Sequence, residues 1–125
     1  PFAAEHFPFM NPSFADMSTP TLVVAGDRDQ STLSTRGPDW FADPYRLSPG
    51  RKSLLTLFGG EHSLGGITGY AAAETTDENP ERVALLQRLT SAYLRSVLGL
   101  DAVSWSEACA ALEASPDPLG RIESK

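Results

Sequence analysis

Two short runs of consecutive apolar residues constrain the fold of this chain more than any other feature. The first, Thr21 to Ala25, follows a proline and stops at Gly26, and the second, Ser53 to Phe58, stops at two glycines. A strand that is apolar at consecutive positions is buried on both faces, as strands of a parallel sheet are. The segment between the runs is longer than the dozen or so residues that a parallel crossover needs. We therefore expect two parallel strands.

A long helix is predicted after the second strand. Asn79 has the character of an N-cap, Pro80 suits the first helical position, and Gly99 suits the left-handed residue that ends a helix. The predicted helix runs from Pro80 to Leu98. Its expected apolar stripe has spacings of three and four and consists of Val83, Leu86, Thr90, Tyr93, Leu94 and Val97. The positions expected to face solvent are Arg82, Gln87, Arg88 and Arg95.

A second, shorter helix is expected near the end of the chain. Ser104 and Glu107 have the spacing of a capping box, and Ala108 and Leu112 continue a short apolar face. Two prolines then end the helix, and residues 115–125 are expected to form a tail. The only cysteine, Cys109, lies in the apolar part of this helix, and we interpret it as a small buried hydrophobic residue.

The remaining segments are expected to be less regular. Residues 1–18 are rich in Phe and Pro, which predicts a loop or docking arm. We also expect a short helix around Ser34 to Phe41 in the crossover, interrupted by Pro44. Residues 19–114 would then form the folded unit, between the arm and the tail.

The order strand, crossover, strand, helix is that of the α/β class. Two strands cannot form a buried parallel sheet alone, because each needs neighbouring strands and helices on both faces. We therefore expect parallel strands with flanking helices in an incomplete sheet that forms the C-terminal portion of a larger domain. The expected partners of its apolar strands and Phe-rich arm are the missing N-terminal part of the same protein or another copy of this chain.

Charge and hydropathy exclude several classes of partner. The net charge of −6 disfavours nucleic acid, since binding to phosphates draws on clustered Lys and Arg. No run approaches the roughly 18 apolar residues of a membrane span, and no basic region followed by an apolar run opens the chain. We expect a cytoplasmic protein that does not contact membranes.

An acid and a histidine follow the two predicted strands at equivalent places. Asp29 lies three residues after Gly26, and His62 follows Gly59 and Gly60. If the strands are adjacent, at about 4.8 Å, the two loops can bring these side chains into contact. A carboxylate bonded to one imidazole nitrogen fixes the tautomer and leaves the other nitrogen to accept a proton from a hydroxyl or water. The pair is therefore a candidate orienting acid and general base.

These segments resemble the C-terminal part of α/β-hydrolases. The stretch from Thr19 to Asp29 resembles the penultimate-strand motif, in which Gly-x-x-Asp carries the triad acid, and Phe58 to His62 resembles the last strand with the triad histidine. The resemblance extends to the closing helix and covers residues 19 to 98, in the family's order of acid then histidine. It implies a hydrolase of small ester-like molecules with Asp29 and His62 as catalytic residues and no cofactor.

The nucleophile of that family is missing from the sequence. No Gly-x-Ser-x-Gly motif occurs in it, and the resemblance places that motif upstream. Three alternatives stay open: an esterase-like or lipase-like serine hydrolase, a dehalogenase or epoxide hydrolase with an aspartate nucleophile, and a non-catalytic binding domain of the same fold. Taken alone, this chain is expected to be inactive.

Other polar residues near the pair have simpler interpretations. Asp27 and Arg28 are expected to be turn and surface residues, Glu61 is left undecided, and Ser63 is expected to point away from its neighbour His62. Carboxylates with an imidazole suit a hard metal ion, but no tight ligand spacing supports one, so we expect no metal. His6, in the arm, is expected to be structural. Leu64, Ile67 and Tyr70 are candidates for lining an apolar substrate pocket, with packing alone as the equal alternative.

Overall fold

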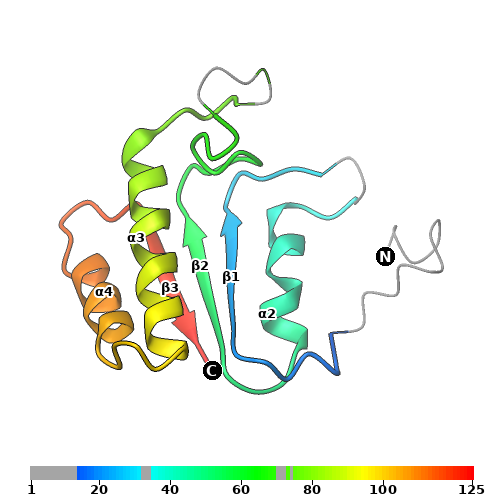
Figure 1. Ribbon diagram of the computed structural model, residues 1–125. Helices are drawn as coiled ribbons and strands as arrows, with labels where there is room; N and C mark the ends of the chain where they lie inside the picture. Colours follow the sequence, from blue (N-terminus) through cyan, green and yellow to red (C-terminus); the bar gives the residue numbers. More distant parts are fainter. Residues whose placement is uncertain (1–13, 32–34, 70–72, 74) are drawn as a thin grey trace.

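The computed structural model describes residues 14–31, 35–69, 73 and 75–125 of the chain (Figure 1). A three-stranded sheet is combined with helices, so the α/β class is confirmed. The elements in order are β1 (Thr21–Gly26), the 3-10 helix η1 (Pro38–Ala42), α2 (Asp43–Leu47), β2 (Lys52–Leu57), α3 (Pro80–Val97), α4 (Ser104–Glu113) and β3 (Gly120–Ser124).

The sheet has the order β1-β2-β3 and is mixed rather than all parallel. The expected parallel pair is confirmed, with Thr21 opposite Lys52 and Gly26 opposite Leu57. Within the described residues β1 pairs only with β2, so its other edge is open.

The expectation of a C-terminal tail is wrong for residues 120–124, which form the antiparallel strand β3 against β2. Ile122 lies opposite Leu55 and contributes to the same core. Gly120 lets the two backbones approach, because a Cβ there would lie 2.5 Å from the carbonyl oxygen of Thr56. A strand with one inward apolar residue is too short to give a recognisable alternation, which is why the pattern failed to predict it.

Helices cover both faces of the sheet. On one face, Leu55 and Leu57 of β2 form the main core with α3 and α4. On the other face, Val23 and Ala25 of β1 pack with Leu54 against η1 and α2. Residues of opposite parity on each strand therefore point to opposite layers, as the consecutive apolar runs predicted.

The ends of α3 agree with the prediction. The side chain of Asn79 caps the helix by accepting a hydrogen bond from the backbone N–H of Arg82, Pro80 occupies the first turn, and Gly99 follows the helix with a φ of 72°. Within the described residues, no helix is both long and apolar enough to cross a membrane.

The predicted faces of α3 are confirmed only in part, because Val83 and Tyr93 are buried and Gln87, Arg88 and Arg95 are exposed as expected. Leu94 and Val97 are about half exposed, and Arg82 is buried rather than solvated. The buried face consists of Arg82, Val83, Leu85, Leu89, Ala92 and Tyr93. The sequence contains two overlapping apolar stripes, and only contact with β2 and α4 decides which of them turns inward.

The short helices differ from the prediction in detail. α4 begins at Ser104 as expected, but no capping box forms, because Val103 occupies the N-cap position and the N–H of Glu107 donates to the carbonyl of Val103. The Ser104 hydroxyl donates to the carbonyls of Ala92 and Asp101. The apolar face is confirmed, since Leu112 is buried and Ala108 packs against the core. Cys109 is half-buried rather than fully buried.

The crossover helix is displaced toward the C-terminus of its predicted range. η1 and α2 occupy residues 38–47, and part of the range predicted for the crossover helix lies outside the described residues. Pro44 occupies the first turn of α2, so it begins a helix that it was expected to interrupt. Most of the Phe-rich arm also lies outside the described residues.

Candidate active site

Asp29 and His62 meet at the carboxyl ends of the two parallel strands. The Nδ1 atom of His62 lies 3.1 Å from Oδ1 and 3.3 Å from Oδ2 of Asp29. The two side chains differ sharply in exposure, with 6% for the carboxylate and 79% for the imidazole. A buried carboxylate thus holds one edge of a ring whose remaining surface faces outward.

This contact defines the tautomer of the neutral ring. A carboxylate can only accept, so we assign the proton to Nδ1 and leave Nε2 as the acceptor. If the ring accepts a second proton, the adjacent carboxylate stabilises the positive charge. The arrangement can therefore orient an imidazole and support it as a proton carrier.

Backbone contacts between the loops after β1 and β2 position the pair. The N–H of Arg28 donates to the carbonyl of Gly60 at 2.9 Å, and the N–H of Gly59 donates to Oδ1 of Asp27 at 2.7 Å. Asp27 is exposed, as expected, but its carboxylate also ties the two loops together. Asp29 comes directly after residues 27 and 28, so these hydrogen bonds also fix its position relative to the loop of His62.

A buried ion pair between Asp77 and Arg82 supports residues 58–65, the loop that carries His62 and is called the histidine loop below. Oδ2 of Asp77 accepts from Nη1 of Arg82 at 3.0 Å and from the backbone N–H groups of Glu61 and Gly65 at 2.8 and 3.0 Å. The other arm of Arg82 donates to the carbonyl of Phe58 at 2.9 Å. One carboxylate and one guanidinium therefore hold the segment from 58 to 65 on both sides of His62.

The sequence analysis missed this ion pair. Arginine is mostly exposed in folded proteins, which favours a solvated position for Arg82 when its sequence is considered alone. One signal was present, because Arg82 lies beside Val83 on the inward side of the helix, with Asp77 just before the N-cap. A Gly-rich loop with many backbone donors needs such acceptors if it is to hold one shape.

The polar residues next to His62 in the sequence, Glu61 and Ser63, differ in environment. Glu61 helps to shape the loop, since it accepts a hydrogen bond from the Thr76 hydroxyl. Ser63 is buried while His62 is exposed, in keeping with side chains that point apart. Within the described residues, no three side chains of the His, Cys, Asp and Glu types gather as a metal site requires.

Of the three residues considered for a substrate pocket, two lie among the described residues. Leu64 has a φ of 51° and packs against the main core, whereas Ile67 is exposed. Tyr70 lies outside the described residues. The aromatic ring seen beside the imidazole is that of Phe41, from the crossover, with 6.0 Å between ring centroids.

No family model, curated protein or solved structure matches this chain. The features that bear on function are therefore those of the site itself: a buried acid, an exposed histidine and the contacts that hold their loops.

Proposed function

We propose that Asp29 and His62 are the acid and the base of a hydrolytic triad in a protein of the α/β-hydrolase type, which cleaves an ester or related acyl bond. The observation that carries the proposal is the 3.1 Å contact between His62 Nδ1 and the buried carboxylate, at the carboxyl ends of adjacent parallel strands. In open α/β sheets, this edge is where ligands bind.

Each residue has a defined role in the proposed reaction. Nε2 of His62 removes the proton from a nucleophilic hydroxyl as the oxygen attacks the acyl carbon, and then gives that proton to the departing alcohol. A water molecule repeats the sequence and releases the acid. Asp29 keeps Nδ1 protonated and stabilises the imidazolium at both stages.

The nucleophile must come from outside these residues. No Gly-x-Ser-x-Gly motif is present, and the outer side of His62 is open to an approaching group. The open edge of β1 supports the same proposal, because further strands of the domain would pair there. An N-terminal part of the same protein that would supply these groups is thus the proposed partner, and a small ester-like molecule is the proposed substrate.

Labelling of the full-length protein with a serine-directed fluorophosphonate tests the proposal. We expect covalent labelling of the wild-type protein and a rate at least about 100-fold lower in His62→Ala, since a general base contributes 10² to 10⁴. Asp29→Asn should also slow the reaction markedly, because the asparagine no longer fixes the tautomer.

Gln30→Ala is the matched control, because this exposed residue adjoins Asp29 without joining the pair. Its labelling rate should equal that of the wild type. A binding domain without catalysis would not be labelled at all, and labelling of His62→Ala at the wild-type rate would also refute the assignment.

A further inference from the structure

The imidazole of His62 has an aromatic neighbour as well as an acidic one. The ring centroids of His62 and Phe41 are 6.0 Å apart, and the two ring planes are inclined at 52°. Aromatic side chains attract each other over this separation. Asp29 and Phe41 both belong to the segment between β1 and β2, so one crossover supplies a polar and an apolar neighbour of the histidine.

The imidazole needs a second contact if it is to keep one orientation. The side chain of His62 is 79% exposed, and the carboxylate of Asp29 contacts it at Nδ1. A hydrogen bond at one edge still leaves the ring free to tilt about that edge. A second ring packed beside it limits the tilt, and so determines the direction in which Nε2 points.

The ring of Phe41 is itself held by the protein. It packs against the core cluster to which Val23, Ala25 and Leu54 belong. It also meets the ring of Trp40 at an angle of 67°, with 5.1 Å between centroids. Because its own position is fixed by packing, Phe41 can restrain an exposed neighbour.

An arginine braces the turn that carries Phe41. Nη2 of Arg36 donates to the carboxylates of Asp39 and Asp43 at 3.0 and 2.9 Å. These two aspartates lie two residues before and two residues after Phe41. Nη1 of Arg46 also donates to the backbone carbonyl of Asp39 at 3.0 Å. The chain is therefore tied on both sides of the residue that reaches His62.

We propose that Phe41 is a positioning residue for His62, whose ring it holds so that Nε2 points toward the incoming nucleophile. Asp29 determines which nitrogen carries the proton, and Phe41 determines where the ring lies. The purpose of this restraint rests on the proposed hydrolytic function. The restraint itself can be measured without any reaction.

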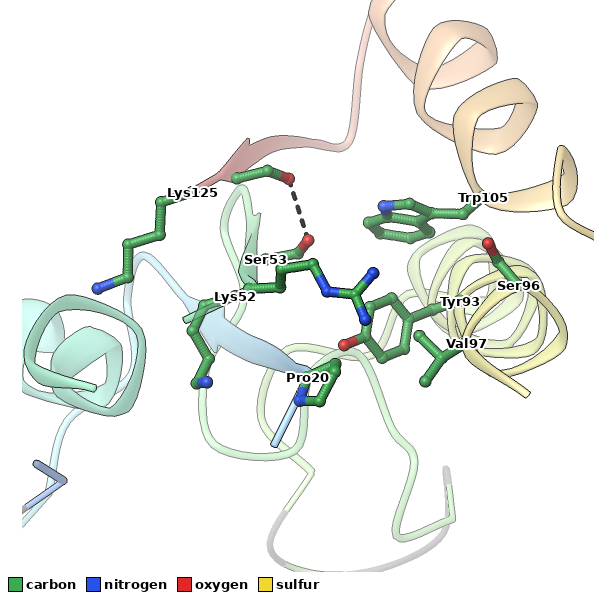
Figure 2. A pocket seen from close by; sticks show the side chains of 10 residues that line it. Pro20, Lys52, Ser53, Tyr93, Ser96, Val97, Trp105 and Lys125 are labelled. Carbon is green, nitrogen blue, oxygen red and sulfur yellow. Dashed lines mark hydrogen bonds between the residues drawn. The ribbon is translucent and has the colours of Figure 1, made fainter. Parts of the chain in front are cut away.

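A second aromatic pair provides a matched control. Tyr93 and Trp105 meet edge to face with 5.2 Å between ring centroids. They line a cavity beside the start of β1 and β2, at the end of the sheet away from His62 (Figure 2). Trp105→Leu thus removes an aromatic ring that packs against the core without reaching the imidazole.

Nuclear magnetic resonance of the full-length protein tests the restraint. The imidazole signals are assigned through their loss in His62→Gln. In the wild type we expect a nuclear Overhauser effect between the ring protons of Phe41 and the imidazole. Phe41→Leu should lower the order parameter of the imidazole C–H bonds, which reports fast motion of the ring. Phe41→Tyr keeps the aromatic ring and should preserve the wild-type value, as should Trp105→Leu.

Fluorophosphonate labelling of the same variants tests what the restraint does. We expect Phe41→Leu to be labelled about three- to tenfold more slowly than the wild type, because its base is less well aligned. Phe41→Tyr and Trp105→Leu should be labelled at close to the wild-type rate.

The proposal is overturned if the wild type shows no Overhauser effect between the two rings, or if Phe41→Leu leaves the order parameter or the labelling rate unchanged. It is also overturned if Trp105→Leu has the same effects as Phe41→Leu. A wild type that is never labelled would instead refute the hydrolytic function, while a fall in the order parameter of Phe41→Leu would still support the restraint.

Discussion

Gly26, the last residue of β1, is in close backbone contact with Gly60, which lies in the loop after β2. A Cβ built on Gly26 would lie only 2.1 Å from the carbonyl oxygen of Gly60, and one on Gly60 would lie 3.1 Å from Cα of Gly26. Only glycine at position 26 allows this approach of two backbones. Because Asp29 and His62 follow these glycines closely, the contact also determines how near the acid and the base can come.

Gly26→Ala should therefore separate the two loops. The obstacle is backbone rather than a flexible side chain, so we expect the free energy of unfolding to fall by about 2 to 3 kcal/mol in denaturant titration. Gly37→Ala is the matched control, since its nearest neighbour would be 3.8 Å from the new Cβ, and its stability should change by less than about 1 kcal/mol. Equal effects of the two substitutions would show that the close approach is unimportant.

Removal of the Arg82 guanidinium should destabilise the histidine loop. Arg82→Met leaves the carboxylate of Asp77 buried without its cation, at an expected cost of about 3 kcal/mol in unfolding free energy. Hydrogen exchange should become faster at the amides of Glu61 and Gly65, which donate to Asp77. Arg88→Met, on the exposed side of the same helix, should leave both measurements near wild type.

The half-buried thiol of Cys109 should react slowly. Burial, and secondarily the charge of Glu113, raise the pKa of this thiol, so less thiolate is present at neutral pH. We expect alkylation by iodoacetamide at pH 7 to be slower than that of a small free thiol, and unfolding in urea to remove the difference. Glu113→Gln should speed the reaction slightly in the folded protein. A folded-state rate equal to that of the free thiol would contradict this environment.

The sequence predicted the features that depend on local chemistry. The two parallel strands followed from consecutive apolar residues, and the start of α3 followed from the capping residue Asn79 and from Pro80. The meeting of Asp29 with His62 followed from equivalent positions after neighbouring strands. Each of these three features can be predicted from a short segment of sequence and one rule of strand or helix geometry.

Features that depend on distant contacts were missed or displaced. β3 exists because Ile122 completes the core beside Leu55, which its own short segment does not reveal. The phase of α3 depends on what it packs against, and so does the burial of Arg82. Similarly, the Ser104 hydroxyl donates to the carbonyl of Ala92 in α3, a contact between two helices that the capping-box spacing of residues 104 and 107 does not reveal.

In the proposed pair, Asp29 holds His62 as the Nδ1-protonated tautomer, and nitrogen-15 resonance of the imidazole measures which ring nitrogen carries the proton. At a pH where the ring is neutral, we predict a protonated Nδ1 and an unprotonated Nε2 in the wild-type protein, with the signals assigned through loss in His62→Gln. In Asp29→Ala, the ring should revert toward the Nε2-protonated form that free histidine prefers. A wild-type ring already protonated at Nε2, or unchanged in Asp29→Ala, would contradict the proposed pair.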